Sequence, residues 1–143
     1  MKYAIRKRSE RKKLRDKIGA LHLKILKFKR GHRSEFTGKE DVVLGRFHIL
    51  DVARFPRLEF HEENILLSEW FGVHFDWHHN YYKAQEIEKR IMELRGKDYK
   101  EKLMMLDRMQ PRMTTLRLQM IYEAFKQAVK EIEAGPKGCS LET

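Results

Sequence analysis

The sequence predicts an α+β protein with a basic N-terminal helix, a small core that contains β-structure, and two or three C-terminal helices. Apolar residues recur at helical spacing near the N-terminus and again over the last 60 residues. Between these regions lie two short runs, 42–44 and 47–50, which are rich in the β-branched and aromatic residues typical of strands. At 143 residues, the chain has the length of one domain with an added arm or helix.

Positive charge is concentrated at the N-terminus. The formal net charge is +10, and residues 1–30 hold 13 Lys or Arg against two acids, Glu10 and Asp16. The rest of the chain holds 18 basic and 19 acidic residues. A basic arm of this kind is typical of nucleic-acid-binding proteins, although a solubilising or membrane-surface tail is the alternative.

The composition also excludes several classes of protein. A single cysteine, Cys139, rules out a disulfide framework and a four-cysteine zinc site. No apolar stretch approaches the roughly 18 residues of a membrane span, and no secretory signal is visible. We therefore expect a cytoplasmic protein (host-cell cytoplasm, if viral) with no membrane partner.

The N-terminal region predicts a basic amphipathic helix over about 10–29 that ends at Gly31. Its apolar residues recur at helical spacing: Leu14, Ile18, Leu21 and Ile25. A strand over 21–25 fits the same residues less well. We divide the chain into an arm and helix (1–30), a core (31–82), a helical region (83–135) and a disordered tail (136–143).

The core region is punctuated by turn-forming residues. The runs 42–44 and 47–50 are separated by Gly45 and Arg46, which predicts one strand or a hairpin. Pro56 favours an irregular loop over 53–60. The apolar run 65–67 that follows Asn64 is a plausible entry to a helix.

Three helices are predicted after residue 83. The first ends at Gly96, the second begins with a capping box of Asp98 and Glu101, and the third has Pro111 in its first turn. The apolar stripe of the third is defined by these residues: Met113, Leu116, Met120, Ala124, and Val129 or Ile132. Six of the seven methionines lie between Met92 and Met120. We expect most of them to fill the core, and an adaptable partner surface is the alternative.

Histidine is unusually dense in one segment. Five of the seven histidines lie between His48 and His79, and the spacing of His74 and His78 places both on one side of a helix, where they can share a metal ion. His48 ends a predicted strand, and Asn64 follows a loop. The order is strand–loop–strand–helix.

This set suits phosphodiester hydrolysis. A neutral imidazole, His48, can take a proton from water, a metal ion can neutralise charge on the phosphate, and Asn64 can orient the base. For either residue alone, a structural role is the favoured interpretation: His48 as an ordinary strand histidine, and Asn64 as the cap of a following helix. The ordered set favours function.

The chain resembles the HNH, or ββα-metal, endonucleases, and in particular the phage recombination nucleases of the Rap and NinG group. The resemblance lies in residues 47–49, 56–60, 62–67 and 74–80. It implies a ββα-metal core in which His48 is the general base, Asn64 orients it, and His74 and His78 bind a divalent metal ion (Mg, Mn or Zn).

The sequence departs from the family at two places. Ser34, Thr37, Ser68 and Phe71 stand where relatives place structural-zinc cysteines, so we expect no structural zinc. Apolar packing around Phe36, Trp70 and Phe71 would take its place. Phe47 stands where many members have a metal ligand, a role that Asp51 or Asp76 would have to fill.

DNA, duplex or branched, is the expected partner. Its phosphates would contact basic residues on the arm and near the site: Arg6, Lys7, Arg8, Arg11, Lys12, Lys13, Arg15, Arg46, Arg54 and Arg57. The expected function is metal-dependent endonuclease action on DNA in recombination, and paired nicking would favour a homodimer. The alternatives are a non-catalytic DNA- or RNA-binding protein with a degenerate HNH fold, and a basic helical interaction protein whose histidines do not converge.

Overall fold

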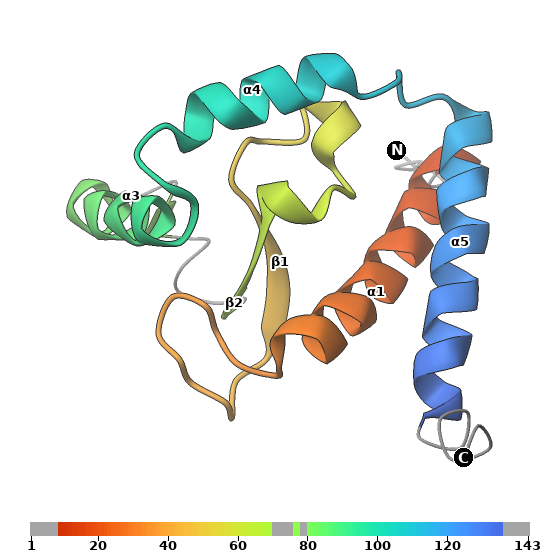
Figure 1. Ribbon diagram of the computed structural model, residues 1–143, viewed down its shortest axis with the longest axis horizontal. Helices are drawn as coiled ribbons and strands as arrows, with labels where there is room; N and C mark the ends of the chain where they lie inside the picture. Colours follow the sequence, from red (N-terminus) through yellow and green to blue (C-terminus); the bar gives the residue numbers. More distant parts are fainter. Residues whose placement is uncertain (1–8, 70–75, 78–79, 136–143) are drawn as a thin grey trace, which may run out of the picture. The chain divides into compact units, whose positions relative to one another are not determined.

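The computed structural model describes residues 9–69, 76–77 and 80–135, and its class is α+β, as predicted. The described part is mostly helical, with one two-stranded antiparallel sheet (Figure 1). The helices and strands are α1 (Glu10–Arg30), β1 (Leu44–His48), β2 (Ile65–Glu69), α3 (Tyr81–Arg95), α4 (Tyr99–Met109) and α5 (Thr115–Ala134). The predicted tail, 136–143, lies outside the described residues.

The chain forms two compact units. The central unit holds residues 26–112, with both strands, α3 and α4. The paired-helix unit joins the described residues 9–25 to 113–135, so it combines most of α1 with α5. Helix α5 therefore groups with α1 and not with α3 and α4.

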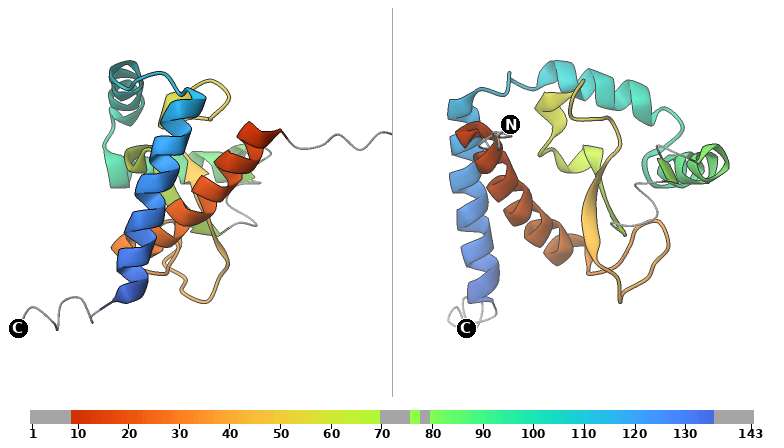
Figure 2. Two further views of the ribbon diagram at one scale, coloured as in Figure 1. Left: turned by 90° about the vertical axis from the view of Figure 1, so that its right-hand side faces the viewer. Right: turned by 180° about the vertical axis from the view of Figure 1, so that it is seen from behind.

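Helices α1 and α5 pack together and run in the same direction (Figure 2). At their N-terminal ends, the Arg11 guanidinium donates to the Thr115 hydroxyl (3.0 Å). Further along, the ring of the buried His22 stacks on Phe125, with 4.9 Å between centroids. The predicted helix over 10–29 is confirmed, and Gly31 ends it with a φ of 89°.

Strand β1 pairs with β2 in antiparallel register, with Leu44 opposite Glu69 and His48 opposite Ile65. Gly45 and Arg46 lie inside β1, so one strand forms and the hairpin alternative is wrong. The predicted helix entry at 65–67 is also wrong, because these residues belong to β2. Residues 65–68 are all buried, and a strand buried on both faces lacks the alternation that distinguishes it from a helix.

The core of the central unit lies on one face of the sheet. Phe47 of β1 is 1% exposed and contacts Phe36 and Trp77 edge to face, at centroid distances of 5.1 and 5.7 Å. Residues of α3 and α4 close this core: Ile87, Ile91, Tyr99 and Leu103. Since side chains alternate along a strand, Phe47 in the core places Arg46 and His48 on the opposite face of β1.

The free edge of β2 is covered by the loop after α1. The Glu35 amide donates to the Leu67 carbonyl (2.8 Å), and the Glu35 carboxylate accepts from the Leu67 amide (2.6 Å). Arg30 donates to both Glu35 (3.1 Å) and the Ile65 carbonyl (2.6 Å). These contacts satisfy backbone groups that would otherwise offer an edge for aggregation.

A hydrogen-bonded turn occupies residues 34–38, which include Ser34 and Thr37, two of the positions predicted to lack a structural zinc. The Ser34 hydroxyl accepts from the amides of Phe36 and Thr37, each at 3.2 Å. Gly38 closes the turn with a φ of 77° and donates to the Ser34 carbonyl (2.8 Å). Phe36 also packs against the core, whereas Trp70 and Phe71 lie outside the described residues. Both polar and apolar contacts therefore hold this turn.

The three predicted C-terminal helices form, but the predicted capping of α4 and the predicted start of α5 are wrong. Helix α3 ends at Gly96, as predicted. The capping box is wrong, because the Asp98 backbone (φ −96°, ψ 23°) is not extended as an N-cap requires, and its carboxylate pairs with Lys102 (3.3 Å). Helix α5 begins after Thr114, whose hydroxyl accepts from the Arg117 amide (3.1 Å), so Pro111 precedes it.

The apolar stripe of α5 also differs from the prediction. Leu118 and Val129 are buried, while Leu116 and Met120 are 66% and 62% exposed. On α4, three methionines are exposed as well: Met104, Met105 and Met109. Core filling is therefore wrong for most of the methionines between Met92 and Met120. The flexible, unbranched side chain of methionine is tolerated on a surface as well as in a core, so helical spacing alone does not predict its burial.

Stability should decrease above pH 10 because of Tyr99. Burial, the negative charge of Glu88 and a hydrogen bond to it (3.2 Å) raise the pKa of Tyr99 to about 12. The folded protein therefore holds this proton more tightly than the unfolded chain, whose tyrosine pKa is about 10. Between these values the free energy of unfolding should fall by about 2–3 kcal/mol.

Urea denaturation at a series of pH values, for the wild type and for Tyr99→Phe, would measure this loss. The variant should lack it, and the exposed Tyr81→Phe should behave as the wild type. Equal alkaline losses in wild type and Tyr99→Phe would contradict the assignment.

Candidate functional site

The candidate catalytic histidine is held by a backbone carbonyl. His48 Nε2 lies 2.9 Å from the Glu59 carbonyl oxygen. A carbonyl can only accept, so Nε2 carries a proton in this contact; if the ring is neutral, Nδ1 is then the nitrogen with the lone pair. Arg46, on the same face of β1, donates to the same oxygen (3.2 Å) and lies 5.4 Å from the centroid of Phe60. The loop between the strands thus fixes the ring orientation.

Asn64 ties the end of that loop to its beginning. Its side chain is fully buried, accepts from the Leu50 amide (2.8 Å) and donates to the Leu50 carbonyl (3.0 Å). Its own carbonyl accepts from the Ile49 amide (2.8 Å). The helix-cap alternative for Asn64 is therefore wrong, because a strand, β2, follows Asn64. The side-chain amide of Asn64 instead bonds the backbone of Leu50, two residues after His48.

His48 and Asn64 converge, because His48 is opposite Ile65 in the sheet. The link between them is the short backbone segment 49–50. Asn64 therefore holds the backbone next to His48, and the two residues that were predicted to act as base and orienting residue lie close together. The neighbouring Phe47 points into the core and has no atom that could bind a metal ion.

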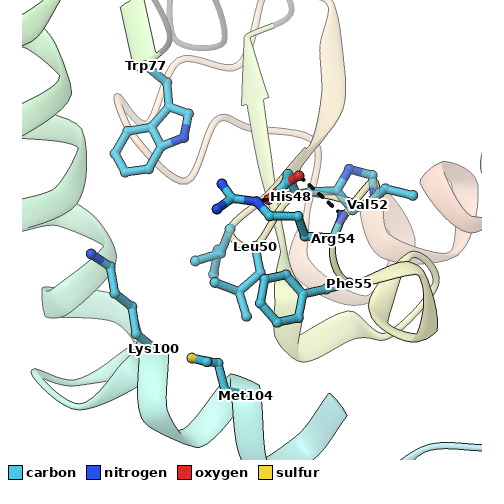
Figure 3. Close-up of a pocket in the computed structure, with 10 residues that line it drawn as sticks. His48, Leu50, Val52, Arg54, Phe55, Trp77, Lys100 and Met104 are labelled. Atoms are coloured by element: carbon cyan, nitrogen blue, oxygen red, sulfur yellow. Dashed lines mark hydrogen bonds and ion pairs between the residues drawn. The ribbon is translucent and has the colours of Figure 1, made fainter. Parts of the chain in front are cut away.

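A pocket of about 740 Å³ opens beside His48 (Figure 3). One wall is the segment after β1, another is Trp77, and the third is α4, from which Lys100 and Met104 reach the pocket. The lining combines cations with apolar groups: Arg54 and Lys100 with Leu50, Phe55, Trp77 and Met104. Lys100 is a pocket residue that the sequence analysis missed, because it is distant in sequence from the histidine segment.

The predicted metal ligands, His74 and His78, lie outside the described residues. Within the described ranges, no group of three His, Cys, Asp or Glu side chains could hold a metal ion. Asp51 lines the pocket, but its carboxylate binds the Arg54 side chain (2.9 Å) and amide (3.3 Å). The other suggested ligand, Asp76, is not among the residues that line this pocket. A metal site with three such ligands would therefore need at least one residue from outside the described ranges.

The predicted nucleic-acid contacts fall into separate groups. Arg6, Lys7 and Arg8 lie outside the described residues. Three exposed residues occupy the first turn of α1: Arg11, Lys12 and Lys13. Lys12 pairs with Asp16 (3.0 Å) and Lys13 with Glu10 (3.2 Å), in exposed pairs that contribute little to stability. Arg15 is only half-buried on the same helix.

The predicted contacts near the site differ in exposure. Arg54 is 81% exposed at the pocket, and Arg57 is half-buried in the loop between the strands. Arg46 holds Glu59 and Phe60, so it is an internal contact of the site.

No described helix is both long enough and apolar enough to cross a bilayer. Comparisons of the chain with protein-family models, curated proteins and solved structures found no match.

Proposed function

We propose that this protein is a metal-dependent endonuclease that cleaves DNA phosphodiester bonds, with an HNH-like ββα core. The observation that supports this most directly is the state of His48. One ring nitrogen donates to the Glu59 carbonyl, so in the neutral ring Nδ1 is the nitrogen that can accept a proton. A general base for water needs this arrangement.

In the proposed mechanism, His48 Nδ1 takes a proton from water as the water oxygen bonds to phosphorus, and the bond from phosphorus to the leaving sugar oxygen breaks. Asn64 is a positioning residue: it holds the backbone at Leu50 and so keeps the imidazole of His48 in place. Arg46 polarises the Glu59 carbonyl and limits its movement. Arg54 and Lys100 hold phosphate groups in the pocket, where their positive charge attracts the polyanion.

The proposed metal ligands are His74 and His78, on the segment that follows β2. A divalent ion bound there would neutralise charge on the scissile phosphate and the leaving oxygen. Recombination intermediates, which are branched, are the proposed substrates, by analogy with the phage nucleases that the sequence resembles.

A nicking assay tests the proposal. Supercoiled plasmid and a four-way junction would be incubated with the protein in Mg²⁺, Mn²⁺ or EDTA, and the products separated by electrophoresis. We expect nicked product with a divalent ion and none with EDTA. Binding without cleavage in every metal would contradict the nuclease.

A second candidate is a non-catalytic DNA- or RNA-binding protein that keeps the same core. It is favoured by the Asp51 carboxylate, which binds Arg54 and so is not placed as a metal ligand. Isothermal titration with Mn²⁺ separates the two candidates. The nuclease requires binding that His74→Ala with His78→Ala removes, and the second candidate predicts no heat in either protein.

A further inference from the structure

A second hollow surface lies in the paired-helix unit, remote in sequence from His48. Two cavities, of about 540 and 240 Å³, adjoin along α1 and α5, and both are lined by Lys17 and Tyr122. Together they form a continuous groove, which we call the α1–α5 groove. Helix α5 contributes one side of it, although the sequence analysis assigned no binding residue to that helix.

The groove is basic. Five cations line it, namely Arg11, Lys13, Lys17, Lys24 and Lys126, against two carboxylates, Glu10 and Glu123. Among the residues that the structure describes, no carboxylate lies within ion-pair distance of Lys17. An excess of positive charge in a concave surface focuses the field on an anionic partner.

The ion pairs in the groove are weak enough to exchange. Lys24 is 3.8 Å from Glu133, with both side chains more than 60% exposed. Lys126 is 4.0 Å from Glu123, and the latter is 70% exposed. Exposed pairs of this type contribute about 0–1 kcal/mol, so phosphates can replace the carboxylates at little cost.

The lysines of α1 form a row along the groove. Lys24 lies 11 residue steps after Lys13, with Lys17 between them, and at a rise of 1.5 Å per residue this row is about 16 Å long. A strand with one phosphate per roughly 3.4 Å of axis would place about five phosphates along this row. The length suits a nucleic-acid backbone better than a single small anion.

One aromatic ring lines both cavities. Tyr122 is half-buried, and the Lys126 ammonium lies 5.1 Å from its ring centroid. A basic groove with an aromatic side chain is the arrangement with which proteins bind unpaired strands, because a base can stack on the ring. A membrane surface, by contrast, is too flat to enter a groove.

We infer that the α1–α5 groove binds an unpaired nucleic-acid strand, with its phosphates on Lys17, Lys24 and Lys126 and a base on Tyr122. The choice of nucleic acid as the partner rests on the proposed function. The inference adds the surface of the protein that would bind it. It assigns the single-stranded part of a substrate to the paired-helix unit, whereas the proposed cleavage site belongs to the central unit.

Fluorescence anisotropy in EDTA tests this without cleavage. A labelled single strand, and a duplex of the same length, would be titrated at several salt concentrations with the wild type and with a triple variant, Lys17→Gln, Lys24→Gln, Lys126→Gln. For the single strand, the slope of log affinity against log salt should become shallower by about 2, and affinity should fall about tenfold or more.

The matched control removes the same charge elsewhere. Lys83→Gln, Lys89→Gln, Lys97→Gln changes three exposed lysines on or beside α3 and should leave the slope unchanged. Circular dichroism would verify that each triple variant is folded. Tyr122→Leu should weaken single-strand binding about five- to 100-fold, while Tyr122→Phe keeps it and duplex binding changes little.

Equal effects of the two triple variants would overturn the inference. So would an effect of the groove variant on binding to phosphatidylserine vesicles with none on the single strand. The two proposals fail separately: groove-dependent binding without nicking in any metal defeats only the nuclease. Nicking by a groove variant that binds single strands like the wild type defeats only the groove.

Discussion

Replacing His48 with glutamine should lower the metal-dependent nicking rate by about 10²–10⁴-fold, the usual contribution of a general base. The glutamine amide can still donate to the Glu59 carbonyl, so the loop between the strands keeps its hydrogen bond. It cannot take a proton from water near neutral pH. The rate would be measured from the conversion of supercoiled to nicked plasmid under single-turnover conditions.

The control for this variant is His32→Gln, which changes an exposed histidine in the same unit. It should leave the nicking rate unchanged. DNA binding in EDTA and the melting temperature should be the same for both variants and the wild type. A His48→Gln protein that nicks at the wild-type rate would remove His48 from the mechanism.

Asn64→Ala should cost about 2–5 kcal/mol of the free energy of unfolding of the central unit. The change removes two hydrogen bonds from a fully buried side chain and leaves the Leu50 amide and carbonyl without these partners. Each orphaned backbone group costs about 1–3 kcal/mol. Both tryptophans of the chain lie between residues 26 and 112, so their fluorescence in urea reports on this unit.

Asn80→Ala is the matched control. The Asn80 side chain caps α3 by accepting from the Lys83 amide, and its loss should cost about 1 kcal/mol. Since Asn64 holds the segment after His48, nicking by Asn64→Ala should also fall at temperatures where the variant is folded. Equal losses of stability in the two variants would show that the Leu50 contacts are unimportant.

The helices were the most predictable elements. The period of apolar residues in α1 and α3 is long enough to be unambiguous, and Gly31 and Gly96 end them in backbone conformations with positive φ that favour glycine. The start of α5 was less predictable, because Pro111 and Thr114 are both good helix-start residues. The Thr114 hydroxyl accepts a hydrogen bond from the Arg117 amide, so the helix begins after Thr114.

Strand β2 could not be distinguished from a helix by period, because residues 65–68 are buried on both faces and show no alternation. The candidate site was predictable in its order along the chain, His48 before Asn64. Its geometry was not, because Glu59 binds His48 through a backbone carbonyl, which every residue type possesses. The position of Lys100 in the pocket and the contribution of α5 to the groove depend on tertiary packing, which no local sequence pattern predicts.

The paired-helix unit has a consequence for biosynthesis. Arg11 meets Thr115 across 104 positions of sequence, whereas the central unit is built from one continuous segment, 26–112. At about 5–20 residues per second, the ribosome completes that segment about 1–4 seconds before it completes α5. During that interval a nascent chain can form the sheet and its pocket while α1 still lacks its partner. The α1–α5 groove can therefore assemble only after α5 has been synthesised, and a chain truncated before Thr115 would lack it.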